Sequence, residues 1–211
     1  EKEIYFTSGG TEADNLALIG TALGNRDKGN HIITTQQEHH AVLHTAEYLE
    51  SIGFDVTYLP VDETGRVSLN EFKQALRTDT ILVSVMFVNN ETGVIQPIAE
   101  IGHILKNHQA YFHTDAVQAY GLLDICVDEL GVDLLTTSAH KINGPKGVGF
   151  LYVRESVPVQ NLVFGGEQER KRRAGTENVP AIVGFKKAVE LMLENKEERK
   201  ESYQRFKESF I

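Results

Sequence analysis

The sequence LLTTSAHKINGPKGVGF, residues 134–150, contains a lysine between the end of an apolar strand and a turn rich in glycine and proline. The strand leads into Ser138, Ala139 and His140, and Lys141 follows directly. A lysine fixed in this way has little freedom to extend into water, and an amine that loses its proton becomes a nucleophile toward an aldehyde. Most lysines are solvated surface charges, so the stretch alone leaves a catalytic and an ordinary Lys141 both open.

Six further segments besides the strand before Lys141 predict strands, because they are short, rich in β-branched and aromatic residues and bounded by turn residues. The seven predicted strands are residues 3–7, 31–35, 54–61, 80–88, 110–115, 134–138 and 148–154. Helical patterns separate most of them. This alternation predicts an α/β fold, a three-layer sandwich in which helices cover both faces of a mostly parallel, mixed seven-stranded sheet.

Helix boundaries are marked by capping residues. Gly53 is a predicted C-cap, and Ser68-Leu69-Asn70-Glu71 is a capping box. Pro97 stands near the start of a helix that we expect to run to about His108. A last helix is predicted from Pro180 to the end of the chain, although its apolar stripe is lost beyond Glu194.

Composition limits the classes of function. The chain has 211 residues, of which 41% are hydrophobic, enough for the core of one domain. Its formal net charge of −9 does not favour direct binding to nucleic acid. No apolar run is long enough to cross a bilayer and no signal peptide opens the sequence, so we expect no membrane association.

The single cysteine, Cys126, excludes an intramolecular disulfide and favours a reducing, cytoplasmic setting. Its apolar neighbours in LLDICVDEL predict a packed, inert thiol. The sequence begins without methionine and stops within a charged helical run. We therefore expect it to be a piece of a longer protein.

A glycine turn connects the first predicted strand to a helix that begins at Thr11-Glu12. This geometry presents backbone N–H groups and the positive end of a helix dipole to an anion. A phosphate can sit on Gly10 and Thr11, with the Thr11 hydroxyl adding a bond. An ordinary strand-to-helix connection explains the same pattern. The turn is neither a Walker A loop nor the dinucleotide fingerprint, which needs a third glycine.

Three histidines, His39, His40 and His44, follow the second predicted strand. His40 and His44 stand four residues apart on a predicted helix, which is a metal-ligand spacing. No third ligand is evident, so we expect no metal site. His39 lies at the strand-to-helix junction, where its ring face is available to a planar ligand.

Polar residues also follow two later strands. Asn90 lies after the apolar run 80–88, at a carboxyl end where open α/β sheets place their sites, although turn chemistry is the alternative. Asp115 ends the next strand and Gln118 follows it. An acid there either caps the next turn or pairs with a buried cation. The basic run 170–173 predicts a mobile or partner-contacting loop, or simply a solvated face.

Taken together, these residues suit pyridoxal phosphate, which needs a Schiff-base lysine, an acid at its ring nitrogen, a phosphate cradle and a group on its ring face. Asp115 suits the nitrogen, because a carboxylate holds the proton that makes the ring an electron sink. Gln118 suits the phenolic oxygen, and His39 suits the ring face.

The chain closely resembles the NifS/IscS-like cysteine desulfurases of the class V aminotransferase family, which are fold-type I enzymes. The matching stretches are TSGGTEADNLAL, EHHAVL, VNNETGVIQPI, FHTDAVQAYG, SAHKINGPKGVGFLYVR and GGEQERKRRAGTEN, in the family's order. The ungapped approach to Lys141 and the RAGTEN stretch favour this branch over the selenocysteine-lyase-like one.

The resemblance implies a role for each matched residue. Lys141 bonds the cofactor and moves protons, with His39 and Asp115 assisting catalysis. The residues implied to bind the cofactor are Gly10, Thr11, His39, Asn90, Asp115, Gln118, Ser138, His140 and Lys141. Of these, Gly10, Thr11, Ser138 and His140 bind the phosphate. Thr176 resembles the family's contact to the phosphate of the other subunit, which implies a homodimer.

The resemblance also implies the reaction. L-cysteine becomes L-alanine, and sulfur passes to an enzyme cysteine as a persulfide, then to a scaffold or tRNA-thiolation protein. The persulfide cysteine and the arginine that binds the substrate carboxylate are expected beyond Ile211. Residues 1–180 are then a large cofactor-binding domain, incomplete at its N-terminus, and residues 181–211 a helix leading toward an absent C-terminal domain.

We expect this chain to be inactive alone. Two alternatives remain open on the sequence. One is another class V enzyme, such as an aminotransferase, a selenocysteine lyase or a kynureninase-like relative. The other is a non-catalytic docking module.

Overall fold

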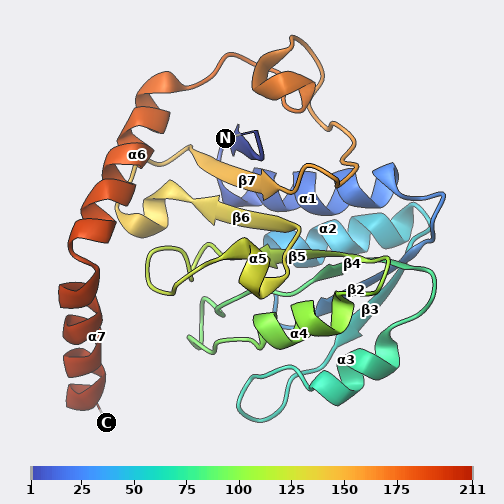
Figure 1. Cartoon of the computed structure of the whole chain (residues 1–211), viewed down its shortest axis with the longest axis horizontal. Coiled ribbons are helices and arrows are strands. Elements are labelled where there is room, and N and C mark those ends of the chain that lie inside the picture. The colour runs from blue at the N-terminus through green and yellow to red at the C-terminus, as the bar shows by residue number, and fades with distance from the viewer. Residues whose placement is uncertain (1, 211) are drawn as a thin grey trace.

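The computed structural model describes residues 2–210, which form a seven-stranded sheet covered by helices on both faces (Figure 1). The strands are β1 Ile4–Thr7, β2 His31–Thr35, β3 Asp55–Leu59, β4 Thr80–Ser84, β5 Tyr111–Asp115, β6 Leu134–Ser138 and β7 Gly149–Val153. Their order is β1-β7-β6-β5-β4-β2-β3. Strands β2 to β6 pair in parallel, whereas β7 is antiparallel to both β1 and β6. The predicted α/β fold with a mostly parallel, mixed sheet is confirmed.

Seven α-helices and two short 3₁₀ turns connect or follow the strands within the described residues. They are α1 Gly10–Gly24, α2 His40–Ser51, α3 Leu69–Ala75, α4 Ile98–Leu105, α5 Val127–Leu130, η1 Ala139–Ile142, η2 Gln168–Lys171, α6 Val179–Glu194 and α7 Lys196–Phe210. Helices α1 and α2 lie on one face of the sheet, and α3, α4 and α5 lie on the other (Figure 1).

The apolar core lies on both sides of the central strands. Ile32 and Leu82 are fully buried in the cluster under α1 and α2, whereas Ile33 and Val83 are fully buried in the cluster under α3, α4 and α5. Successive residues of a strand point to opposite faces, so continuous apolar runs are needed wherever both faces are covered. This burial fixes the register of the sheet and hence the position of the residues that follow each strand.

Local signals place several helix ends as predicted. The Ser68 hydroxyl accepts a hydrogen bond from the backbone N–H of Glu71 at 3.3 Å, which begins α3. The C-cap of α2 is Ile52, and Gly53, the predicted C-cap, follows it with a φ of 94°, a left-handed conformation that costs glycine little. Pro97 directly precedes α4, which ends at Leu105 rather than at His108.

The predicted last helix is wrong in one respect, because it is two helices. Asn195 ends α6, and both its backbone N–H and its side-chain Nδ2 donate to the carbonyl of Leu191. A side-chain amide that competes for a helix carbonyl in this way favours a helix end. Helix α6 buries Phe185 and Met192 against η1, but α7 buries none of its residues 196–210 and runs along one side of the molecule (Figure 1).

Among residues 2–210, no helix combines the length and the apolar character that a membrane span requires.

Candidate active site

A cavity of about 210 Å³ lies at the carboxyl-terminal edge of the parallel strands. The loops after β1, β2, β4, β5 and β6 all contribute to its lining, as expected at this edge of an open α/β sheet. Among its lining residues are nine of the ten predicted site residues: Gly10, Thr11, His39, Asn90, Asp115, Gln118, Ser138, His140 and Lys141. The tertiary structure therefore gathers residues that lie up to 131 positions apart in the sequence.

Lys141 belongs to the short turn η1, which follows β6 directly. Its neighbours Ala139 and Ile142 are buried against α6, and Asn143 closes the turn in a left-handed conformation with a φ of 64°. The backbone is thus anchored on both sides of the lysine. The Lys141 side chain itself is exposed, so the expectation that it has little freedom to reach water is wrong for this chain. The fold fixes the backbone of Lys141, but it does not bury the side chain that carries the amine.

Asp115 ends β5 and is only 6% exposed. Its Oδ1 accepts a hydrogen bond from the backbone N–H of Val117 at 2.9 Å, so the carboxylate caps the next turn and also lines the cavity. Burial raises the pKa of Asp115, while the Val117 hydrogen bond and the side chains of His39 and Lys141 oppose that rise. The Asp115 carboxylate therefore has a fixed orientation, and a positive charge nearby stabilises its ionised form against the effect of burial.

His39 is the N-cap of α2. Its Nδ1 accepts a hydrogen bond from the backbone N–H of Ala41 at 3.1 Å, which leaves the ring proton on Nε2. The neighbouring His40 and His44 rings have centroids 5.1 Å apart. Within the described residues there is no group of three or more side chains suited to holding a metal ion.

The N-terminus of α1 faces the end of β6. A Cβ built on Gly10 would lie 3.0 Å from Cγ2 of Val117 and 3.8 Å from Cβ of Ser138, so only glycine fits there without displacing a neighbour. The Ser138 hydroxyl and Nδ1 of His140 are hydrogen bonded at 2.8 Å. The first N–H groups of a helix have no intrahelical acceptor, and a 15-residue helix adds its dipole. This corner of the cavity suits an anion.

Thr176 lies apart from the other predicted site residues. It lines a separate cavity of about 220 Å³ with Ser8 and Gly147, among others. The structure therefore does not bring Thr176 to the cavity of its own chain.

All four side chains of the basic run 170–173 contact their own chain, Lys171 through Glu167 at 2.9 Å. The guanidinium groups of Arg170 and Arg172 lie 4.4 Å and 5.2 Å from the centroid of the Tyr5 ring. Arg173 pairs with Glu12. The interpretation as a simply solvated face is therefore wrong for Arg172 and Arg173, which are partly buried against an aromatic ring and a carboxylate, whereas Arg170 is exposed.

The family model described as Aminotransferase class-V matches residues 1–209. The chain belongs to the class-V aminotransferase family.

Curated relatives of this class-V chain are cysteine desulfurases by name. The chain is 65% identical over 210 residues to "Putative cysteine desulfurase IscS 1" of Bacillus subtilis (strain 168), and the match covers 100% of this chain and 55% of that protein. It is 59% identical over 211 residues to "Cysteine desulfurase IscS" of Methanosarcina thermophila, covering 100% and 52%. The resemblance to NifS/IscS-like cysteine desulfurases is thus confirmed, and the chain spans about half the length of the curated relatives it matches.

Solved structures agree with this membership. One described as "NIFS-LIKE PROTEIN" matches with a TM-score of 0.90 at 45% identity, covering 93% of this chain and 55% of that one. DndA from Streptomyces lividans matches with a TM-score of 0.87 at 43% identity, covering 93% and 57%.

The class-V chain also contains buried acids that sequence reasoning missed. Asp14 on α1 is 1% exposed and lines the cavity, and its Oδ1 faces Nε2 of the buried His113 at 3.6 Å. Glu38, directly before His39, is also buried. Asp14 stands one helical turn after Gly10, on the same face of α1, and this spacing is the signal that could have found it.

The prediction that Cys126 is a packed thiol is wrong. Cys126 is exposed and directly precedes α5. Its neighbours Ile125 and Val127 pack against the core, as does Leu123. In extended backbone, side chains alternate in direction, so three apolar residues at every second position turn Cys126 outward.

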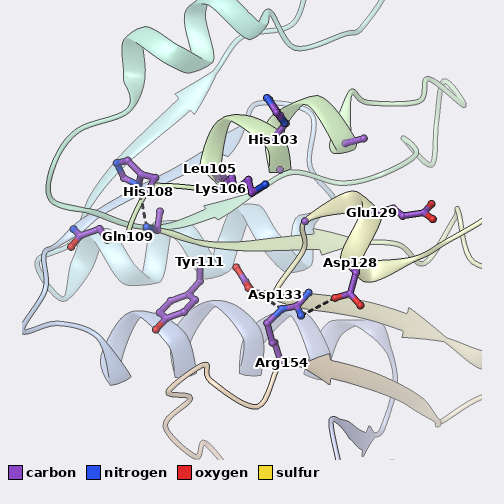
Figure 2. Close-up of a pocket in the computed structure, with 14 residues that line it drawn as sticks. His103, Leu105, Lys106, His108, Gln109, Tyr111, Asp128, Glu129, Asp133 and Arg154 are labelled. Carbon is purple, nitrogen blue, oxygen red and sulfur yellow. Dashed lines mark hydrogen bonds and ion pairs between the residues drawn. The ribbon is translucent and has the colours of Figure 1, made fainter.

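The opposite edge of the sheet has a cavity of about 460 Å³, between α4, α5 and the start of β5 (Figure 2). Arg154 crosses it. Its Nη1 donates to Asp128 Oδ1 at 2.9 Å, its Nε lies 3.3 Å from Asp133 Oδ1, and its Nη2 donates to the carbonyl of Val132 at 3.0 Å. Because Arg154 already has partners within the protein, we interpret its role here as structural. It joins α5 to the segment that leads into β6.

Proposed function

We propose that this chain is the cofactor-binding part of a pyridoxal-phosphate-dependent cysteine desulfurase, whose whole protein converts L-cysteine to L-alanine. The observation that carries the proposal is the single cavity lined by Lys141, Asp115 and His39 together with an anion-suited helix N-terminus. The names of the curated relatives support the same activity.

The residues present suit pyridoxal phosphate. That molecule combines a cationic ring nitrogen, an aldehyde and a phosphate, and the cavity offers a buried carboxylate, an amine and a helix N-terminus. At Gly10 an added Cβ would lie 3.0 Å from Cγ2 of Val117, so the absence of a side chain keeps the helix start open to a phosphate. When bound, the cofactor supplies an electron sink for bond changes in an amino acid.

Each residue then has a definite task. Lys141 would supply the amine that holds the cofactor aldehyde, and its Nζ would be placed to move protons to and from the substrate. Asp115 would hold the proton on the ring nitrogen. Burial raises the pKa of Asp115, and a positive charge beside its carboxylate would oppose that rise. His39 would present its ring to the cofactor ring, Gln118 would contact the phenolic oxygen, and Asn90 would contact cofactor or substrate.

The phosphate would lie in the corner formed by Gly10, Thr11, Ser138 and His140. Backbone N–H groups at a helix start and short hydroxyl donors are the usual partners of a phosphate. Thr176 is proposed to reach the phosphate of a second subunit. Its place outside its own chain's cavity is compatible with that role and supports a homodimer.

The sulfur would pass to a cysteine outside the described chain. The sequence contains one cysteine, Cys126, and that residue does not line the cavity. The whole protein would then hand the sulfur to a scaffold or tRNA-thiolation partner in the cytoplasm. We expect the 211-residue chain alone to release no more sulfide from L-cysteine than free cofactor does.

The test is to add pyridoxal phosphate to the chain, reduce with borohydride, digest and map the labelled peptide by mass spectrometry. The label is expected on Lys141 and absent in Lys141→Ala. Lys146→Ala is the matched control, since Lys146 is an exposed lysine in the same glycine-proline turn. Label spread over several lysines, or retained in Lys141→Ala, would contradict the proposal.

A further inference from the structure

Glu38 links three segments around the cavity. It lies in the turn between β2 and α2, directly before His39, and is 5% exposed. Its Oε1 accepts hydrogen bonds from the Thr35 hydroxyl at 2.7 Å and from the backbone N–H of Met86 at 2.9 Å. One carboxyl oxygen therefore joins the end of β2 to the backbone that continues β4.

A second contact joins the same two segments. The Asn89 side-chain amide donates to the carbonyl of Gln37 at 2.9 Å. His39 stands on one side of this junction, and Met86 and Asn90 on the other, and all three line the cavity. The junction thus sets the separation of two cavity walls.

The His39 ring depends on the turn that Glu38 holds. Because Nδ1 of His39 caps α2 through the Ala41 N–H, the ring orientation follows the backbone of the turn. A shift of the turn away from Met86 would move the ring out of the cavity or break the cap. Glu38 is the residue whose side chain opposes that shift.

The electrostatic surroundings favour an uncharged Glu38. The charged or titratable groups that act on it are Asp115 on β5 and Asp14 on α1, and His39 is its neighbour in the chain. The charge of Lys141 acts on Asp115. Burial raises the pKa of Glu38 to about 8, and the Asp115 charge adds to that rise, although the Met86 and Thr35 hydrogen bonds oppose it.

The hydrogen-bond geometry is compatible with a protonated acid. Both accepted hydrogen bonds go to Oε1, whereas Oε2 is buried and has no partner among the described residues. A proton on Oε2 therefore leaves the two bonds intact, and its O–H has no acceptor among the described residues. A glutamine would offer the same single acceptor without a charge.

We propose that Glu38 is a positioning residue, which acts as a neutral acid to hold the His39 ring at the cofactor face of the cavity. This inference rests on the proposed function for the identity of the cofactor. The placement of His39, however, can be measured without any cofactor.

The experiment compares Glu38→Gln, Glu38→Ala and the matched control Glu47→Gln, an exposed glutamate on α2. Nitrogen-15 spectra of the His39 imidazole are recorded on the cofactor-free chain between pH 5 and about 9. We expect one tautomer, protonated on Nε2, in the wild type, Glu38→Gln and the control, but mixed tautomers in Glu38→Ala. A step near pH 8 should appear in the wild type and vanish in Glu38→Gln.

A second readout is the affinity for pyridoxal phosphate, followed by circular dichroism of the bound cofactor. Glu38→Gln should bind within about threefold of the wild type, and Glu38→Ala about tenfold more weakly, because the Met86 N–H is left buried without an acceptor. If Glu38→Ala does not fold, the pH step decides the question, because Glu38→Gln should remove it and Glu47→Gln should keep it.

The outcomes separate the two proposals. Equal damage by Glu38→Gln and Glu38→Ala, or normal His39 signals in Glu38→Ala, would overturn the role of Glu38. A wild-type chain that does not bind pyridoxal phosphate at Lys141 would contradict the proposed function. The His39 imidazole signals would still test the role of Glu38, because they are recorded without cofactor.

Discussion

Arg173 holds Glu12 through two hydrogen bonds, although 161 positions separate the two residues. Nε of the arginine lies 2.7 Å from Oε1 of the glutamate, and Nη2 lies 3.1 Å from Oε2. Oε2 also accepts the backbone N–H of Ser8 at 2.9 Å. The pair fastens the loop after β7 to the turn that begins α1, next to the anion-suited corner of the cavity.

We predict that Glu12 and Arg173 stabilise the fold as a unit. A double-mutant cycle with Glu12→Ala and Arg173→Ala should give a coupling of about 1 kcal/mol at pH 7, since the pair is partly exposed and screened by solvent. Chemical denaturation measures it. A coupling near zero would mean that the two hydrogen bonds contribute nothing to stability.

The same pair should respond to acid. Burial raises the pKa of Glu12, but the hydrogen bonds from Arg173 and Ser8 outweigh it and leave the pKa below its ordinary 4.5. A lowered pKa in the folded state means that the stabilisation is present above the unfolded pKa and is lost as pH falls through the folded one. The coupling should therefore disappear in strong acid.

His113 gives a second acid-dependent contribution. It is fully buried, with Nδ1 2.9 Å from the Ser84 hydroxyl and Nε2 3.0 Å from the Thr136 hydroxyl, and burial lowers its pKa to about 3. The unfolded chain binds a proton there first, so stability should fall as pH drops from about 6.5 toward 3.

In the variant His113→Gln, the free energy of unfolding should lose the part of its pH dependence that His113 contributes. Urea titrations at pH 7 and pH 5 are sufficient to detect it. The control His44→Gln changes an exposed histidine and should leave the slope unchanged. An unaltered slope in His113→Gln would mean that His113 does not titrate during unfolding.

Asp115→Asn should weaken cofactor binding without unfolding the chain. The amide keeps the oxygen that accepts the Val117 N–H, so the turn after β5 survives. The loss of the negative charge at the ring nitrogen should reduce affinity about tenfold or more, the usual worth of a hydrogen bond to a charged group. Asp27→Asn, an exposed aspartate, is the control. An unchanged affinity in Asp115→Asn would mean that the Asp115 charge does not contribute to cofactor binding.

Cys126 should react with iodoacetamide in the folded chain, because it is exposed. Mass spectrometry of the native protein should show one added label. Cys126→Ser should change neither stability, beyond about 0.5 kcal/mol, nor cofactor binding, since a surface substitution of this kind removes no packing. Labelling that requires denaturant would contradict the exposed position.

Much of the fold was predictable because its signals are local. Short β-branched runs such as HIITT at 31–35 specify strands, and the turn before Thr11 and the capping box at Ser68 specify helix starts. Strand extension beyond Ser84 was expected and only partly correct. Val85 and Phe87 continue to donate backbone hydrogen bonds toward β5, but the regular strand ends at Ser84.

Contacts between distant segments were not predictable, because no local pattern encodes them. The strand β7 inserts between β1 and β6 in the antiparallel direction, and this choice depends on which strand edges are free once the others have paired. The pairing of Arg173 with Glu12 and the break at Asn195 likewise depend on neighbours in space.

The candidate site also has features that were predictable from local sequence and features that depend on distant contacts. The sequence by itself determined the residue types and their order: a lysine after a strand, an acid at a strand end, a glycine turn before a helix and a histidine cap. Only the tertiary structure decided that nine of these residues share one cavity, that Thr176 does not, and that Asp14 and Glu38 are buried beside them. The reason is physical. Residue chemistry is fixed along the chain, whereas burial, and with it the charge state of a carboxyl group, exists only after distant strands have packed together.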